Sequence, residues 1–423
     1  MQRVFEIIFS NRKNLENFSI LLFVNILTAG LGWLTQIKIA NSVGKEVFGQ
    51  IAFGVVLGTY GQVFIRFGLD HTLVRDLIHY PDRFADIIRA SLFLRYTLAI
   101  ISILVFLIFN IINTSSKLEW GIILIFSAIA LLSLDLQPVY DALQKMQRHA
   151  IYFLIQKACY LLIVWFMILF FPNHFSVLWI GMAMLFASLL YLLMQHRWAI
   201  NHIASYTLTN NTLISDIRWL INKNWLIWLA AICGLVAVML NQPILKYYAG
   251  DSELGGYAAA WQVMMIGHLF VDQLGRFGRP GMARYTRPEI TNDNLIRFLF
   301  KYSVAMTGVA LPLTISMIFI PDFIFQLLFK PEYAAASKTL PVFGSYLLLF
   351  ALGVVASQYV LSVRLEKIYF FSVLIGGLTS VFLCYLIIPE YKSIGAAWVL
   401  LLAHGSSLLV YAIAMVRHIQ EHS

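Results

Sequence analysis

The stretch from residue 36 to residue 75, QIKIANSVGKEVFGQIAFGVVLGTYGQVFIRFGLDHTLVR, decides the fold. An apolar helix ends here near Lys38, a polar turn follows at residues 41–49, and residues 51–67 form a second apolar run that contains Arg66. One charge at the centre of a bilayer costs roughly 2.5–3.5 kcal/mol on insertion scales. Charges inside such an apolar hairpin therefore predict that something polar is met within a membrane.

A fainter copy of this hairpin returns about 207 residues later. Gln242 corresponds to Gln36 at an offset of 206 residues, and Gly256 corresponds to Gly49 at an offset of 207. The copy continues through an apolar run to Arg276. Two copies in the same order predict two related halves of the molecule.

The composition excludes a soluble protein. Of the 423 residues, 60% are hydrophobic and 12% are charged, and the mean hydropathy is +0.78, whereas a soluble domain is about 45–50% apolar. We therefore predict an all-α polytopic membrane protein with about 12 transmembrane helices of about 20 residues each. The expected spans are residues 18–39, 51–69, 87–112, 120–140, 151–171, 177–194, 220–245, 257–274, 298–320, 340–363, 368–388 and 394–416.

A polar segment at residues 195–223 divides these spans into two sets of six. It predicts an N-lobe at residues 1–205, which begins with an amphipathic segment, and a C-lobe at residues 206–423. Because six spans return the chain to its starting side, the two six-helix lobes should be related by a pseudo-two-fold axis along the membrane normal. In this topology 20 of the 30 Lys and Arg residues lie on the side of the two termini, which predicts that both termini are cytoplasmic.

Other features of the sequence narrow the function classes. The net charge of +9 is explained mostly by the basic residues that set the topology of a membrane protein, and it also attracts the chain to anionic lipid head groups. It gives no reason to expect nucleic acid as a partner. The sequence has neither a phosphate-binding glycine loop nor a His/Cys/Glu cluster with metal-ligand spacing, so we expect no nucleotide hydrolysis, metal or cofactor. The connections expected on the outer side are short, which argues against an enzyme.

Polar side chains recur at helical spacing in three spans, which marks faces turned to protein or to a water-filled cavity. Arg66 corresponds to Asp272, and Asp70 to Arg276, at an offset of 206 residues. We predict that these opposite charges pair across the axis and form a gate. Local i,i+4 pairing within each helix remains the alternative. The stripes are Asn25, Thr28, Gly32 and Gln36; Thr59, Gln62, Arg66 and Asp70; and His268, Asp272 and Arg276.

Other ionisable residues within the spans leave their roles open. Asp135 is a counter-ion candidate for Arg95 or for Lys157, and the sequence does not choose between them. Lys38 and Lys246 occupy matched positions near the outer ends of their spans, where anchoring at the interface is as good an explanation as ligand binding.

Two further features lie on the candidate cavity helices. Trp33 and Trp261 are placed either to stack on sugar rings or to pack in the ordinary way. Residues 241–243, Asn-Gln-Pro, predict a bend in the seventh span, because proline removes a helical hydrogen bond. Such a bend is either a hinge or a static kink.

Four motifs carry a resemblance to a known family: IANSVGKEVFG at residues 39–49, FGLDHTLVR at 67–75, PGMAR at 280–284 and IPEYKSIGAA at 388–397. In this order, and over nearly the whole chain, they resemble polysaccharide-unit flippases of the Wzx type, in the multidrug/oligosaccharidyl-lipid/polysaccharide exporter superfamily. The resemblance implies a cationic cavity between two lobes, a bacterial inner-membrane location and alternating access. The implied substrate is an oligosaccharide unit on undecaprenyl pyrophosphate, as in O-antigen and lipopolysaccharide biosynthesis.

The resemblance also assigns expected roles. The pyrophosphate would be bound by the cavity cations Arg66, Arg95, Arg276, Lys38 and Lys246. Sugar contacts are expected from Asn25, Gln36, Gln62, Gln242, Trp33 and Trp261, and gating or ion pairing from Asp70, Asp272, His268 and Asp135. A polysaccharide polymerase, a chain-length regulator and a coupling ion, H⁺ or Na⁺, are the implied partners.

Two alternatives from other classes remain. A cation-coupled drug exporter of the same superfamily would be expected to rely on acidic groups, whereas the charges within these spans lean basic. A membrane-embedded enzyme of lipid-linked sugar metabolism is disfavoured by the short outer connections.

Overall fold

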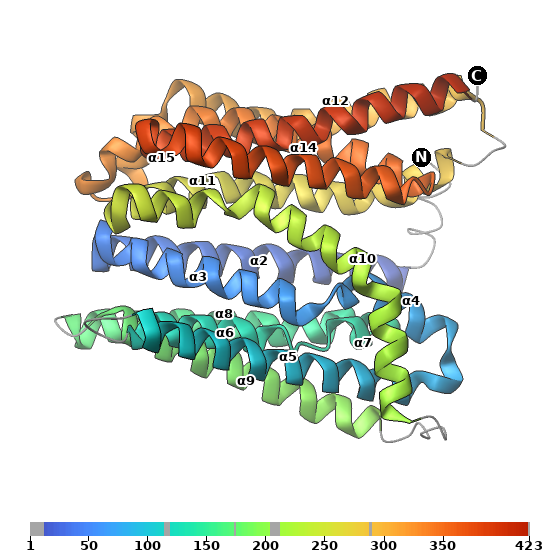
Figure 1. Ribbon diagram of the computed structural model, residues 1–423, viewed down its shortest axis with the longest axis horizontal. Coiled ribbons are helices and arrows are strands. Elements are labelled where there is room, and N and C mark those ends of the chain that lie inside the picture. Colours follow the sequence, from blue (N-terminus) through green and yellow to red (C-terminus); the bar gives the residue numbers. More distant parts are fainter. Residues whose placement is uncertain (1–11, 114–118, 173–174, 204–211, 287–289, 422–423) are drawn as a thin grey trace. The chain divides into compact units, whose positions relative to one another are not determined.

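Helices make up nearly all of the structure, a computed structural model that describes residues 12–113, 119–172, 175–203, 212–286 and 290–421 (Figure 1). Within those residues no strand occurs, as expected for a chain whose backbone groups must bond to each other inside a bilayer. The predicted all-α membrane fold is confirmed. The expected amphipathic segment at the N-terminus lies mostly outside the described residues.

The chain forms two compact units, which differ from the expected lobes in their boundaries. The first unit holds residues 1–42 and 57–229, and the second holds residues 43–56 and 230–423. The divisions fall at the last residue of α2 (Arg12–Val43) and inside α3 (Lys45–Arg66) and α10 (Leu213–Met239). The predicted boundary between residues 205 and 206 lies outside the described residues.

The first unit is built mainly from α2 (Arg12–Val43), α5 (Phe84–Asn113), α6 (Trp120–Leu132), α8 (Met146–Phe170) and α9 (Val177–Ile203). Two short helices, α4 (Leu69–His79) and α7 (Gln137–Ala142), pack on each other, and a 3-10 turn, η1 (Pro81–Arg83), leads from α4 into α5. The helix α9 packs along both α6 and α8.

An ion pair and a buried hydrogen bond attach the beginning of α10 to the first unit. Lys223 Nζ lies 2.5 Å from Asp76 Oδ1, and Asp76 is 1% exposed. One residue further along α10, Asn224 Oδ1 accepts a hydrogen bond of 2.6 Å from Thr72. These contacts explain why the first unit extends into α10 as far as residue 229.

The second unit contains α11 (Asn241–Tyr285), α12 (Asn292–Phe319), α14 (Leu340–Ser362) and α15 (Glu366–Glu421). Between α12 and α14 the chain forms α13 (Pro321–Leu328) and the 3-10 helix η3 (Pro331–Thr339). The helix α14 packs against α12, α11 and α15, and a cluster of buried side chains that includes Val271, Met306 and Ala351 fills the space among them.

Two long helices each contain a reversal of the chain. The helix α15 has a non-helical residue at Lys392, and the hydroxyls of Ser372 and Ser407 each donate to the other's carbonyl oxygen, at 2.7 and 3.0 Å. A straight helix would separate residues 35 positions apart by about 50 Å, so the two halves of α15 lie side by side. In α11 the non-helical residue is Gly250, and Asn241 Nδ2 donates to the hydroxyl of Tyr257 at 2.7 Å.

These reversals bear on the number of spans. Nine described helices or helix pairs are long and apolar enough to cross a membrane, and α2, which carries the first expected span, is not among them. Two of the nine, Leu213–Tyr285 and Glu366–Gln420, include the reversals and so accommodate two expected spans each. Within the described residues, the helices fit the twelve spans predicted from the sequence.

Candidate functional site

The candidate site in the first unit is built around Arg66, the last residue of α3. Phe67 and Gly68 follow with φ of 49° and 70°, and α4 begins at Leu69. A side chain on Gly68 would be strained in this left-handed conformation and would lie 3.0 Å from the backbone nitrogen of Trp228. The turn brings the Arg66 guanidinium to Asp70 in the first turn of α4, where Nη1 and Oδ2 are 2.9 Å apart.

Arg95 of α5 reaches the same carboxylate from the other side. Its Nη2 lies 2.9 Å from Asp70 Oδ1, and its Nη1 donates to the carbonyl oxygen of Asp135 at 3.1 Å. The Arg95 side chain is only 2% exposed. It therefore acts as a buried cross-link between α4 and the chain segment that carries Asp135.

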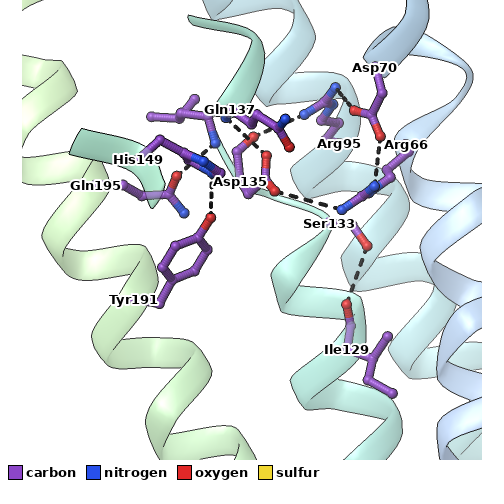
Figure 2. A network of polar contacts seen from close by, with 11 residues as sticks. Arg66, Asp70, Arg95, Ile129, Ser133, Asp135, Gln137, His149, Tyr191 and Gln195 are labelled. Atoms are coloured by element: carbon purple, nitrogen blue, oxygen red, sulfur yellow. Dashed lines mark hydrogen bonds and ion pairs between the residues drawn. The ribbon is translucent and has the colours of Figure 1, made fainter. Parts of the chain in front are cut away.

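Asp135 lies in a break within the expected fourth span. The helix α6 ends at Leu132 and α7 begins at Gln137, so some backbone groups between them have no helical partner. The side chain of Gln195 on α9 accepts a hydrogen bond of 2.8 Å from the freed N–H of Leu136, and Asp135 Oδ1 accepts one of 3.0 Å from Gln137. Asp135 Oδ2 is thereby held 3.7 Å from Arg66 Nη2. Figure 2 draws this contact together with those of Asp70 and Arg95.

The network of Arg66, Asp70, Arg95 and Asp135 is electrically balanced, with two guanidinium groups and two carboxylates. Arg66 and Arg95, both expected to be cavity cations, are paired with carboxylates here, and their role in binding a substrate stays a prediction. Arg66 is nevertheless 32% exposed, and its 3.7 Å separation from Asp135 exceeds the usual 2.7–3.2 Å of an N–H···O hydrogen bond. One edge of the Arg66 guanidinium is therefore only weakly engaged.

The structure gives Asp135 different contacts from the two proposed in the sequence analysis. Its carboxylate faces Arg66, and Arg95 binds its carbonyl oxygen, whereas Lys157 Nζ lies 5.2 Å from the ring centroid of Phe153. Sequence reasoning did not identify Gln195 as a support of this break, nor the 2.7 Å hydrogen bond between Tyr191 and His149 beside it. Gln195 could not be found from the sequence pattern, because a single polar residue that faces a helix break does not recur at helical spacing.

The second unit contains four of the predicted charged residues. His268 Nδ1 lies 3.3 Å from Asp272 Oδ2, and Asp272 is 50% exposed. Arg276, one turn further along α11, is exposed. Lys246 Nζ lies 2.8 Å from Asp251 Oδ1 and 4.1 Å from the ring centroid of Phe53.

Three members of the proposed gate, Arg66, Asp70 and Asp272, each have a described neighbour within their own unit, whereas Arg276 is exposed. Arg66 pairs with Asp70 as the local i,i+4 alternative predicts, and Asp272 pairs with His268. The pairing of Arg66 with Asp272 across the lobes stays a prediction.

The remaining candidates are dispersed over the two units. In the first unit Lys38 is exposed with Nζ 5.5 Å from the ring centroid of Trp165. In the second unit Gln242 is 4% exposed, and Trp261 packs edge-on against Phe343 at 5.9 Å. Four further candidates of the first unit are partly exposed: Asn25, Trp33, Gln36 and Gln62.

Solved structures with this fold are membrane transporters and flippases. Lipid II flippase MurJ, in an inward closed conformation, matches with a TM-score of 0.74 and 12% identity over 95% of this chain and 89% of its own. The MATE multidrug transporter DinF-BH matches with a TM-score of 0.66 and 15% identity over 94% and 93%. An inward-facing multidrug resistance MATE family transporter of the MOP superfamily matches with a TM-score of 0.63 and 13% identity over 96% and 98%.

These identities are low, so the similarity establishes the fold, which agrees with the multi-pass membrane architecture described above. No curated protein matches the chain significantly. The family of polysaccharide biosynthesis proteins, however, matches residues 14–274, more than half of the sequence. The chain therefore belongs to the polysaccharide biosynthesis protein family and has the fold of MOP superfamily transporters.

Proposed function

We propose that the protein is a flippase that moves an oligosaccharide linked to undecaprenyl pyrophosphate from the cytoplasmic to the periplasmic leaflet of a bacterial inner membrane. The family and the fold support a flippase or transporter at the coarse level. The weakly engaged edge of the Arg66 guanidinium is the observation that carries the anionic substrate class. The product would enter the biosynthesis of a surface polysaccharide such as the O-antigen of lipopolysaccharide.

The geometry of the network favours a ligand that competes with Asp135. A guanidinium binds two phosphate oxygens through parallel N–H donors, and Arg66 has one edge facing a carboxylate at 3.7 Å. Arg95 and Asp70 are held at 2.9 Å and would keep Arg66 in place while the ligand replaces Asp135. Binding would then release Asp135 from Arg66, and the phosphate would take its place as the counter-ion of the guanidinium.

Other residues take supporting roles in this proposal. Arg276, Lys246 and Lys38 would provide further cations for the pyrophosphate during its passage. The sugar unit would be contacted by the partly exposed polar and aromatic side chains on α2 and α3. A polysaccharide polymerase and a chain-length regulator would act on the product. A coupling ion, either H⁺ or Na⁺, would supply the energy for transport. Both termini would face the cytoplasm.

The test is transport by purified protein in liposomes that contain lipid-linked oligosaccharide in one leaflet. Wild-type protein should move the intact lipid to the other leaflet, and Arg66→Ala should abolish this movement, while Arg66→Lys retains a charge but loses the fork and should keep only part of it. Arg197→Ala is the matched control, because Arg197 is an exposed arginine on α9 of the same unit. Asp135→Asn, which removes the competing carboxylate, should tighten binding of the pyrophosphate head.

Three outcomes would refute the proposal. Arg66→Ala protein that moves the lipid at the wild-type rate would exclude the role of Arg66. Wild-type protein that exports a cationic dye but leaves the lipid-linked oligosaccharide in place would instead identify a drug exporter, and a chemically altered lipid would identify an enzyme.

A further inference from the structure

A lysine near the middle of α8, Lys157, takes no part in the Arg66 network of the first unit. The helix begins at Met146 and ends at Phe170, which places Lys157 about 16 Å along its axis from the first residue. A single charge at such a depth in a bilayer costs several kcal/mol unless something polar meets it. The surroundings of this ammonium therefore indicate what it is for.

The direction of Lys157 follows from residues seven positions apart, which lie on one face of a helix. Ala150 and Val164 flank Lys157 at this spacing, and both are buried. Leu162 and Leu169 share a row that lies about 140° away around the helix, and both are exposed. Lys157 thus faces the interior of the first unit, whereas a lysine that only anchors the helix at the interface would extend along its lipid-facing side.

The helix α2 passes Lys157 at a residue without a side chain. A Cβ on Gly32 would lie 4.0 Å from Lys157 Cδ, and the ammonium lies 5.2 Å from the ring centroid of Phe153, one turn earlier on α8. Asn25 and Gln36, which are partly exposed, belong to the same stripe of α2 as Gly32. Within the described part of the chain, no carboxylate forms an ion pair with Lys157.

A row of side chains connects this lysine with the Arg66 network. Phe153 packs edge-on against Tyr191 at 5.7 Å, and Tyr191 shares a hydrogen bond of 2.7 Å with His149, which Figure 2 shows beside the network. His149 and Lys157 are eight residues apart on α8, about 12 Å along the helix. A pyrophosphate bound at Arg66 does not extend that far, but the sugars attached to it do.

We propose that Lys157 binds a carboxylate on the sugar part of the substrate, as in a hexuronic acid, and so selects acidic oligosaccharides. The ammonium donates charge-assisted hydrogen bonds to the carboxylate oxygens, and the ring of Phe153 packs against the apolar face of the sugar. The carboxylate supplies the negative charge that the described helices do not provide at Lys157. This inference rests on the proposed function, because the pyrophosphate at Arg66 fixes where the sugars lie.

The experiment compares the affinities of two synthetic lipids for the full-length protein in nanodiscs. Each probe is a geranyl pyrophosphate that carries a disaccharide, and the outer sugar is glucuronic acid in one probe and glucose in the other. The probes differ only in a carboxylate that replaces a hydroxymethyl group, so the ratio of their affinities isolates the contribution of that carboxylate. Wild-type protein should bind the acidic probe at least about tenfold more tightly, as expected for a hydrogen bond to a charged group.

Lys157→Met keeps the apolar length of the side chain and should abolish this preference, so that the acidic probe binds no more tightly than the neutral one. Lys157→Gln tests the same point with a polar side chain, should the methionine variant fail to fold. Lys145→Met is the matched control, because Lys145 is an exposed lysine directly before α8, and it should keep the wild-type ratio. Arg66→Ala should weaken the binding of both probes and leave a preference for the acidic one.

Two results would overturn the inference. One is wild-type protein that binds the two probes equally. The other is a preference in Lys157→Met or Lys157→Gln as large as in wild type, including the case in which both probes bind more weakly by the same factor, since Lys157 would then contact the pyrophosphate or support the fold.

Failure of the proposed function has a different signature. Protein that prefers the acidic probe through Lys157, but moves no lipid-linked oligosaccharide between leaflets, keeps the carboxylate site and loses the flippase assignment. Protein that moves the lipid but binds the two probes equally keeps the flippase assignment and loses the carboxylate site.

Discussion

The contact between the beginning of α3 and α11 in the second unit permits a sharp prediction. Two glycines meet backbone directly: a Cβ on Gly49 would lie 1.9 Å from the carbonyl oxygen of Asp251, and a Cβ on Gly255 would lie 1.9 Å from that of Lys45. Ordinary carbon–oxygen contacts are about 3.3–3.6 Å. Replacing Gly255 with alanine therefore requires the helices to separate by roughly 1.5 Å.

No side chain can move aside to relieve this clash, because both obstacles are main-chain atoms. Overpacking of a close contact costs about 1–3 kcal/mol, and Gly→Ala returns about 0.4–1 kcal/mol by restricting the unfolded chain. The separation would also stretch the ion pair that joins the two helices beside the contact, Lys45–Glu253 at 3.9 Å. We expect Gly255→Ala to lower stability by about 1–2 kcal/mol, taking these terms together.

Thermal unfolding of the purified protein in detergent measures this effect. Gly255→Ala and Gly49→Ala should each unfold several degrees below wild type, and the double variant should lose less than the two single losses together, because one separation accommodates both methyl groups. Gly308→Ala is the control, since a Cβ there meets nothing within 4 Å, and it should be as stable as wild type or more so. Equal melting temperatures for Gly255→Ala and Gly308→Ala would refute the close-contact reasoning.

Two further predictions concern buried charges in the first unit. Arg95→Leu removes one of the two arginines of Asp70, which keeps Arg66 at 2.9 Å, and leaves the carbonyl oxygen of Asp135 without its donor; it should cost about 1–3 kcal/mol, seen as a lower melting temperature, and a variant that melts as wild type does would contradict the cross-link. Lys223→Met leaves Asp76, which is 1% exposed, buried without its lysine and should lower the melting temperature, and adding Asp76→Asn should restore most of the loss. A double variant less stable than Lys223→Met would show that the pair is not the source of the effect.

The course of the helices was predictable because the bilayer leaves the chain few choices. Apolar runs of the right length marked the spans, and the polar residues between them marked the reversals that the structure places at Gly250 and Lys392. The helices α10 and α11 are divided at Leu240, three residues before Pro243, but Leu240 keeps a right-handed helical conformation, so the bend predicted from Pro243 stays a prediction. The length and hydropathy of a span can be read from the sequence without knowing which helices are its neighbours.

The contacts of the charged residues were predictable only where both partners lie on one turn of chain. Arg66 and Asp70 are four residues apart, although the turn at Phe67 and Gly68, and not a continuous helix, brings their side chains together. The contact of Asp135 with Arg66 was not predictable in this way, because it depends on a break between α6 and α7 that the continuous apolar sequence does not reveal. The available signal was Pro138, three residues later, since proline disfavours helix in the residue before it. The 147 positions between Asp76 and Lys223 exceed what any local pattern can report.

The charge balance of the Arg66 network also constrains how a transporter of this kind would work. A guanidinium that waits in an apolar surrounding without a counter-ion would be costly and would hold an anion too firmly to release it. Here Asp70 and Asp135 already pair with Arg66 in the absence of a ligand. The free energy of binding an anion is therefore only the difference between its contacts with Arg66 and those that Asp135 gives up. An anion that displaces Asp135 leaves that carboxylate without its guanidinium and adds negative charge to the network, which offsets part of the binding energy and favours release after binding. A positively lined cavity without the two aspartates would favour binding of the anion but not its release.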